Sequence, residues 1–189
     1  MGRKYILLIC LFLPLALGAD GQNLVVVSKW NYRLVVVTRR GDTLLSCPVG
    51  LGARIGQKRA SGDRRTPEGI FPIVSIEDAS GWKHDFGDGS GLRAGAYGQW
   101  FIRLGVEGFT GIGIHGTCFP ETIGSYSSEG CLRLHDADLA RLVRLVHAGD
   151  LVVILPDDGL APEPLLPLPP QDTTPVWLPR WGADATSPR

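Results

Sequence analysis

The sequence predicts a mainly β domain with one principal α-helix. Short segments rich in valine, leucine and isoleucine alternate with glycine, proline, asparagine and aspartate along most of the chain, a pattern typical of strands joined by turns. Only one segment, after Asp136, has apolar residues at three- and four-residue spacing, as on one face of a helix. At 189 residues, 44% of them hydrophobic, the chain is long enough for one such domain with a proper core.

The predicted strands begin with residues 24–30 and 33–38. Only Asn31 and Tyr32 separate these two runs, so we expect a hairpin with a tight turn, and residues 39–42 predict another turn. The remaining predicted strands are residues 43–49, 69–76, 100–104, 111–115 and 151–155.

The predicted helix follows Asp136, whose carboxylate suits an N-cap. Its apolar face consists of Leu139, Leu142, Val143 and Val146. Gly149 occupies the kind of position where helices end, so the helix is expected to stop there.

The two ends of the chain differ in composition from the predicted domain of residues 23–155. Residues 1–18 combine a basic start, a short apolar run and small residues near Gly18, which predicts a signal peptide. A permanent anchor is the alternative, although a membrane-spanning helix needs about 20 apolar residues. Residues 156–189 contain nine prolines and predict a flexible C-terminal tail. An exported chain with no membrane span after signal cleavage is expected in the periplasm or elsewhere in the cell envelope.

Charge and the longest polar segment limit the functions to consider. The 19 basic and 19 acidic residues are spread along the chain, so no nucleic-acid surface is predicted.

Residues 77–99 are polar and rich in glycine, and this segment is long for a passive connection. They form either a lid over a binding groove or a solvated insertion without a role.

Two ordered motifs carry the chemical signal. His115-Gly116-Thr117 is followed, sixteen positions after the histidine, by the cysteine of Ser128-Glu129-Gly130-Cys131-Leu132-Arg133. Upstream lie Lys58-Arg59, Gly62-Asp63, Arg65-Thr66-Pro67-Glu68-Gly69 and Phe71. Together these motifs resemble the signature of the YkuD-type L,D-transpeptidases over residues 23–155. The resemblance implies a YkuD-like β-sandwich or barrel-like domain that acts on peptidoglycan peptide stems.

The candidate catalytic residues are Cys131 and His115. A cysteine nucleophile needs a thiolate, which a nearby imidazole promotes, so His115 is the expected proton acceptor and donor. Gly130 lacks Cβ and allows close approach of the backbone to a substrate, so we expect an oxyanion hole formed by the amides around Gly130 and Cys131. By resemblance to the family, the carbonyl of Gly116 orients the imidazole.

The resemblance also implies a reaction. Cys131 attacks the carbonyl of the third, L-centred residue of a tetrapeptide stem, D-alanine leaves, and a thioester remains. An amine on a second stem or an envelope protein then attacks the thioester, giving a 3-3 cross-link or protein attachment. Water in place of the amine would make the protein an L,D-carboxypeptidase. No metal or other cofactor is required.

Further candidates concern substrate binding by Arg133, Ser128 and Thr117. The guanidinium of Arg133 suits a substrate carboxylate, but it equally suits a bond to loop carbonyls or to Asp136. Ser128 and Thr117 also suit hydrogen bonds within their own loops, and for both of them this structural role is favoured. The aromatic residues Trp82, Tyr97 and Trp100 either line a peptide groove or belong to the core.

Several alternatives remain open. Signal cleavage would leave Cys47, Cys118 and Cys131, so Cys118 pairs with Cys47, or with Cys131, or all three thiols stay unpaired. His115, Cys118, Cys131 and His135 are also residue types of a zinc site, although the setting of Cys131 favours a nucleophile. A catalytically inactive peptidoglycan-binding or scaffold protein is the alternative from another class.

Overall fold

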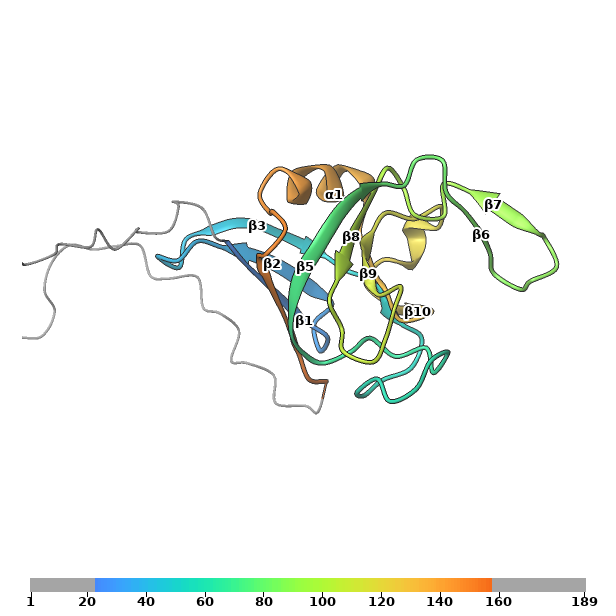
Figure 1. Cartoon of the computed structure of the whole chain (residues 1–189), viewed down its shortest axis with the longest axis horizontal. Helices are drawn as coiled ribbons and strands as arrows, with labels where there is room; N and C mark the ends of the chain where they lie inside the picture. The colour runs from blue at the N-terminus through green and yellow to red at the C-terminus, as the bar shows by residue number, and fades with distance from the viewer. Residues whose placement is uncertain (1–22, 158–189) are drawn as a thin grey trace, which may run out of the picture.

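The computed structural model describes residues 23–157 (Figure 1). Within them the mainly β expectation is confirmed. The strands are β1 (Leu24–Ser28), β2 (Arg33–Val37), β3 (Thr43–Pro48), β4 (Leu51–Gly52), β5 (Gly69–Asp78), β6 (Lys83–Asp85), β7 (Leu92–Ala94), β8 (Trp100–Leu104), β9 (Gly113–His115), β10 (Tyr126–Ser128), β11 (Leu132–Arg133) and β12 (Leu151–Leu155). The helices are the 3-10 turn η1 (Pro120–Thr122) and α1 (Asp136–Val143).

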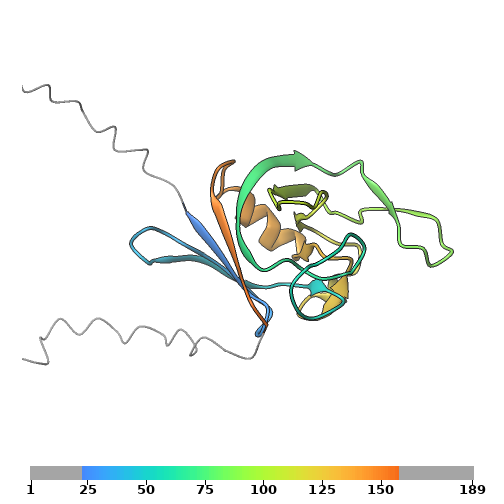
Figure 2. The same ribbon diagram turned by 60° about the horizontal axis from the view of Figure 1, so that its bottom comes forward.

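Eight strands form one sheet in the order β11-β9-β8-β5-β12-β1-β2-β3. The sheet curls into a half-barrel, and Figure 2 shows α1 inside the curl. β1 pairs in parallel with β12 and antiparallel with β2. At the other end of the sheet, β11 pairs in parallel with β9. The candidate cysteine and histidine therefore belong to neighbouring segments at one edge of the sheet.

The core lies between the concave face of the sheet and α1. Alternation along β1 and β2 buries Val25, Val27, Leu34 and Val36, as expected for strands with one face in the core. Helix α1 contributes Leu139 and Leu142, which are also buried. Burial of these aliphatic side chains is the main force that holds the helix in the curl.

Two details of the predicted helix are wrong. The N-cap is His135, without a side-chain cap bond, and Asp136 is the first helical residue. The helix ends at Val143, well before Gly149. Beyond it, the amides of Arg144 and Leu145 bond carbonyls three residues back, at 3.2 and 2.8 Å. Such turns keep Val146 buried, so the apolar spacing continues where the α-helix does not.

The short strands were not predicted. β4 and β10 form a separate two-stranded sheet, as do β6 and β7, and the latter lies within the polar segment 77–99. β1 is also shorter than expected because the chain turns at residues 29–32, where Tyr32 has a φ of 52°. Runs of two or three strand residues carry too little periodicity to stand out in a sequence.

The predicted signal peptide at residues 1–18 lies outside the described residues, and so does nearly all of the predicted tail, from residue 158 onward. The last described residue, Asp157, accepts hydrogen bonds from the amide of Gly56 at 2.8 and 3.0 Å and lies 3.1 Å from Lys29 Nζ. Within residues 23–157, no helix is long and apolar enough to cross a membrane.

Candidate active site

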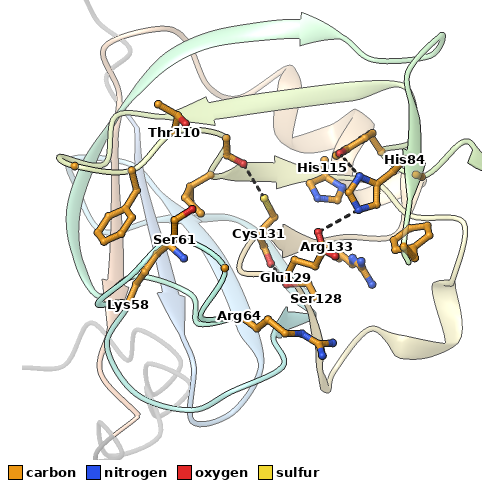
Figure 3. Close-up of a pocket in the computed structure, with 18 residues that line it drawn as sticks. Lys58, Ser61, Arg64, His84, Thr110, His115, Ser128, Glu129, Cys131 and Arg133 are labelled. Atoms are coloured by element: carbon orange, nitrogen blue, oxygen red, sulfur yellow. Dashed lines mark hydrogen bonds and ion pairs between the residues drawn. The ribbon is translucent and has the colours of Figure 1, made fainter. Parts of the chain in front are cut away.

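A pocket of about 500 Å³ opens at the sheet edge formed by β9 and β11, and both Cys131 and His115 line it (Figure 3). Its walls come from the segment around Lys58 and Arg64, the β6–β7 hairpin, residues 96–97, the loop of residues 108–112, the end of β9, and the loop that carries the cysteine. Cys131, His115 and Arg133 all line it. The two sequence motifs therefore share one cavity with the upstream motif and the polar segment.

The register of β9 and β11 brings the two candidate catalytic residues together. Ile114 pairs with Leu132, and His115 pairs with Arg133. The imidazole at the end of β9 and the thiol just before β11 consequently lie on adjacent segments, although sixteen positions separate them in the chain.

Ser128 fixes the conformation of the loop that carries Cys131. Its hydroxyl donates to the carbonyl of Cys131 at 2.6 Å and accepts from the amide of Gly130 at 3.1 Å. Gly130 has a φ of 134°, and a Cβ there would lie 2.9 Å from the carbonyl oxygen of Arg65. Only glycine fits this position without strain, so the local sequence dictates how the thiol is presented.

The Cys131 thiol is half-buried and donates to the carbonyl of Gly111 at 3.2 Å. Burial raises its pKa to about 11. The amide of Gly113 and the charge of Arg133 act in the opposite direction, whereas the Glu129 carboxylate adds to the rise. The thiol is therefore protonated at neutral pH in this structure, and it needs a base to become a nucleophile.

His115 is buried and can act as that base. Its Nδ1 lies 2.6 Å from the carbonyl oxygen of Gly116. A carbonyl only accepts hydrogen bonds, so Nδ1 carries the proton and Nε2 keeps its lone pair. Burial lowers the pKa of His115 to about 4, against a smaller opposing effect of the Gly116 carbonyl. The imidazole is therefore neutral at neutral pH.

Gly116 must be glycine for this arrangement. A Cβ there would collide with the side chain of Asp136 and lie 2.8 Å from the Cα of Gly98. The close packing of Gly116 against Gly98 is supported by a backbone bond from Gly116 N to Tyr97 O at 2.8 Å. The carbonyl predicted to orient His115 is thus held in place from two sides.

Arg133 is buried, and its guanidinium lies 5.8 Å from the ring centroid of Phe86. Among the described residues, its Nε has no hydrogen-bond partner, so the structural bond to Asp136 or to loop carbonyls is not made through this atom. Burial lowers the pKa of Arg133, while Cys131 and Cys118 oppose that fall. Arg133 lines the pocket as a buried cation, and a guanidinium suits an incoming carboxylate.

Gly130, Ser128 and Thr117 make hydrogen bonds within their own loops. The amide of Gly130 donates to Ser128, so in this structure it is not available to an oxyanion. Ser128 uses its hydroxyl within the loop rather than toward a substrate. Thr117 does not line the pocket described above, and its Oγ1 accepts from the amide of Phe119 at 3.0 Å. Ser128 and Thr117 thus have the structural roles that their residue types also allow.

Of the three aromatic candidates, only Tyr97 lines the pocket. Its ring packs edge-on against His115 with centroids 4.9 Å apart. Trp82 packs behind Tyr97 and Phe101, and Trp100 packs against the core. Trp82 therefore supports the ring beside His115, and Trp100 belongs to the packing around the core.

Two polar residues of the pocket were not predicted. His84, on β6, contacts Glu129 of the cysteine loop and also Tyr97. Forty-five positions separate His84 from Glu129, and neither residue belongs to a pattern that would join them. The only sequence signal was the unusual length of the polar segment 77–99.

The cysteine alternatives are decided by position. Cys47, Cys118 and Cys131 are all unpaired, so the structure contains neither the Cys47–Cys118 nor the Cys118–Cys131 disulfide. Cys47 is a core residue of β3, where burial, followed by the charge of Asp138, raises its pKa to about 12. Within residues 23–157, no three histidine, cysteine or acidic side chains are grouped as a metal site would require.

Comparison with solved structures defines the class of domain. The L,D-transpeptidase from Mycobacterium smegmatis superposes with a TM-score of 0.54 at 18% identity, covering 70% of this chain and 58% of that one. L,D-transpeptidase 3 from Mycobacterium tuberculosis, in complex with a faropenem-derived adduct, superposes with a TM-score of 0.53 at 17% identity. This match covers 71% of this chain and 60% of that one. The half-barrel therefore has the L,D-transpeptidase fold.

The family follows from the sequence match. The YkuD profile, described as the L,D-transpeptidase catalytic domain, matches residues 22–154, and the chain belongs to this family. "Putative L,D-transpeptidase YkuD" of Bacillus licheniformis is 29% identical over 126 residues, 67% of this chain and 62% of that protein. "Putative L,D-transpeptidase YqjB" of Bacillus subtilis is 32% identical over 99 residues, which are 51% of this chain and 55% of that protein. The chain thus matches about three fifths of these relatives' length.

Proposed function

We propose that the protein is a peptidoglycan L,D-transpeptidase in which Cys131 is the nucleophile and His115 is its base. One observation carries the proposal: the thiol and a neutral imidazole line the same pocket, and the 2.6 Å contact of Nδ1 with the Gly116 carbonyl leaves Nε2 free to accept a proton. Family membership supplies the substrate class, the peptide stem of peptidoglycan.

The first half-reaction starts from an uncharged pair. A thiol with a pKa of about 11 does not give its proton to an imidazole with a pKa of about 4 in the resting site. Proton transfer therefore accompanies attack: the thiol turns from Gly111 toward His115, sulfur bonds the carbonyl carbon, and Nε2 takes the proton. The protonated imidazole then gives this proton to the departing D-alanine amine, and a thioester remains on Cys131.

Arg133 fits the role of a carboxylate anchor for the donor stem, because it is a cation on the pocket wall whose Nε has no acceptor within residues 23–157. The amide of Cys131 remains the candidate donor to the oxyanion, since that of Gly130 is engaged with Ser128. Both groups are on the walls of a cavity large enough for part of a peptide.

The second half-reaction depends on the acceptor. An amine of a second stem or of an envelope protein gives a cross-link or an attachment, and water gives a carboxypeptidase. Each acceptor loses a proton to His115 as it attacks the thioester carbonyl. The C–S bond then breaks, and His115 returns the proton to the sulfur of Cys131. With residues 1–18 as a signal peptide, the reaction takes place outside the cytoplasm, in the periplasm or elsewhere in the envelope, without a cofactor.

The test is intact-mass spectrometry of the purified protein after incubation with a tetrapeptide-stem muropeptide. We expect an adduct whose mass equals the stem minus D-alanine, together with free D-alanine, and neither product with Cys131→Ala. The Cys118→Ala variant should still form the adduct. Equal D-alanine release by Cys131→Ala would overturn the assignment of the nucleophile.

One observation favours a second candidate, a peptidoglycan-binding or scaffold protein without turnover. The thiol hydrogen-bonds Gly111 and its pKa is raised rather than lowered, as in an unreactive cysteine. Binding of the muropeptide by the wild-type protein, with no adduct and no D-alanine under reducing conditions, would select this function.

A further inference from the structure

The β6–β7 hairpin forms part of the pocket wall, but its strands do not pair with the eight-stranded sheet. Each strand has three residues, and the pair forms a sheet of its own, separate from the eight-stranded sheet. An isolated two-stranded hairpin is marginally stable in water. Figure 1 shows it projecting beyond the curled sheet. Its position over the pocket must therefore depend on side-chain contacts.

His84 provides polar contacts of this kind at the middle of β6. Its Nε2 lies 3.1 Å from Glu129 Oε2, and its Nδ1 lies 3.0 Å from the hydroxyl oxygen of Tyr97. Because a carboxylate only accepts, Nε2 carries a proton. In the neutral tautomer, Nδ1 then accepts from the tyrosine hydroxyl. One imidazole thus satisfies two pocket residues at once, as Figure 3 shows for the two dashed contacts of His84.

The two partners of His84 are next to the candidate catalytic residues. Glu129 directly precedes Gly130 and Cys131, and its charge acts on the thiol. The ring of Tyr97 packs against His115 with centroids 4.9 Å apart. Displacement of His84 would therefore reach both the loop that carries the nucleophile and the ring that supports the base.

Aromatic contacts of the same hairpin mark the face that closes on the pocket. Phe86 packs edge-on against Phe119 at 5.2 Å and lies near the Arg133 guanidinium. His84 and Phe86 both line the cavity. The hairpin therefore covers the side of the pocket that Arg133 lines.

We propose that His84 is a positioning residue that holds the β6–β7 hairpin over the pocket by bridging Glu129 and Tyr97. This inference rests on the proposed function, because it concerns how a peptide stem is enclosed during acylation of Cys131. His84 itself touches no reacting atom, and it acts through the cysteine loop and through the ring beside His115.

Two substitutions separate the two contacts of His84: the ε arm, from Nε2 to Glu129, and the δ arm, from Nδ1 to Tyr97. In His84→Asn the amide replaces the δ position and retains only the Tyr97 contact, whereas in His84→Gln it replaces the ε position and retains only the Glu129 contact. Glu129→Ala removes the acceptor of the ε arm. Lys83→Gln changes the neighbouring, exposed β6 residue and is the matched control. All variants use the full chain.

Two readouts are measured on each variant: amide hydrogen exchange of residues 83–94 without substrate, and the second-order rate of adduct formation. Because the ε arm joins partly exposed groups, we expect His84→Asn and Glu129→Ala each to speed exchange and slow acylation by about threefold to tenfold. The double variant, His84→Asn with Glu129→Ala, should exchange its hairpin amides no faster than either single variant, because both changes remove the same contact. His84→Gln should have a smaller effect on exchange, and Lys83→Gln should match the wild type.

Unchanged hairpin exchange in both His84→Asn and Glu129→Ala would overturn the inference, and so would additive effects on hairpin exchange in the double variant. Failure of the proposed function gives a different result, since the wild-type protein would then form no adduct while the exchange measurement still reports the bridge. Faster exchange with an unchanged acylation rate would also contradict the positioning role, because the bridge would then be structural only.

Discussion

The imidazole of His115 lies flat against the ring of Phe101, with the ring centroids 5.5 Å apart and the planes 12° apart. The two residues are register partners on β9 and β8, and both are buried. Water is therefore excluded from one face of the imidazole. This apolar wall is the physical reason why burial dominates the fall of the His115 pKa to about 4.

The first prediction concerns the pH dependence of acylation. A base with a pKa of about 4 is lost by protonation only when the pH falls through that value, and a thiol with a pKa of about 11 stays protonated until far above neutrality. The rate of adduct formation should therefore rise through pH 4 to 5 and stay level to about pH 10. Stopped-time mass spectrometry across this range checks it. A rise centred near pH 8.5 would instead indicate an isolated thiol.

The second prediction concerns stability. The folded-state pKa of His115 is lowered to about 4, below the unfolded value of about 6.5, so the unfolded chain binds more protons in between. The contribution of His115 to the free energy of unfolding is fully present above pH 6.5. It declines by on the order of 3 kcal/mol as the pH falls toward 4. Urea unfolding at pH 7.5, 5.5 and 4.5 measures it, and His115→Gln should lack this component.

A third prediction follows from Cys47, which is 1% exposed in the core. Burial raises its pKa to about 12, so neither access nor ionisation favours reaction with a thiol reagent. In the folded protein under native conditions, Cys47 should stay unmodified while Cys118 is modified. Peptide mapping after timed alkylation tests this, with urea-unfolded protein as the control in which Cys47 reacts. Rapid native labelling of Cys47 would contradict its placement in β3.

Arg133 should show opposite effects on stability and on activity. Arg133→Met removes a buried charge whose Nε has no hydrogen-bond partner in the described part of the chain, so the free energy of unfolding should be unchanged or higher. Loss of the carboxylate anchor should lower kcat/KM about tenfold to a hundredfold. Arg133→Lys keeps the positive charge but lacks the guanidinium that can donate two parallel hydrogen bonds to a carboxylate, so it should recover only part of the activity. A strongly destabilised Arg133→Met protein would instead indicate a structural role.

The fifth prediction concerns Lys29, whose side chain is 0% exposed. Its Nζ lies 2.6 Å from Glu68 and 3.1 Å from Asp157, and it donates to the carbonyl of Gly56 at 3.0 Å. Lys29→Met would leave two carboxylates without their cation and should lower the free energy of unfolding by about 3 to 5 kcal/mol. Denaturant titration beside Lys83→Gln, which should stay within about 0.5 kcal/mol of wild type, measures the difference.

Much of the fold could be predicted because its long strands are strongly patterned. The valine-rich β1 and β2 and the aliphatic β12 were found with small errors at their ends. The end of α1 was missed because Val146 remains buried after the helix has stopped. The pairing of β11 with β9 was missed because two or three residues carry no periodicity, yet this pairing is what brings the two motifs together.

The candidate site also has parts that the sequence could predict and parts that it could not. Cys131, His115 and Gly116 belong to local motifs, so a sequence pattern can point to them. The contact between His84 and Glu129 depends on how a hairpin folds back over a loop, and no local pattern encodes it. The engagement of the Gly130 amide by Ser128 depends on a few tenths of an ångström in a tight loop, which residue types alone do not determine.

The place of β12 in the sheet has a consequence for biosynthesis. β12 bonds β5 on one side and β1 on the other, so without it the order of strands separates into β11-β9-β8-β5 and β1-β2-β3. A nascent chain on the ribosome cannot complete the eight-stranded sheet until residues 151–155 have left the exit tunnel. The domain should therefore remain unfolded through nearly all of its translation, which is the state in which a polypeptide can still be threaded through a narrow translocation channel.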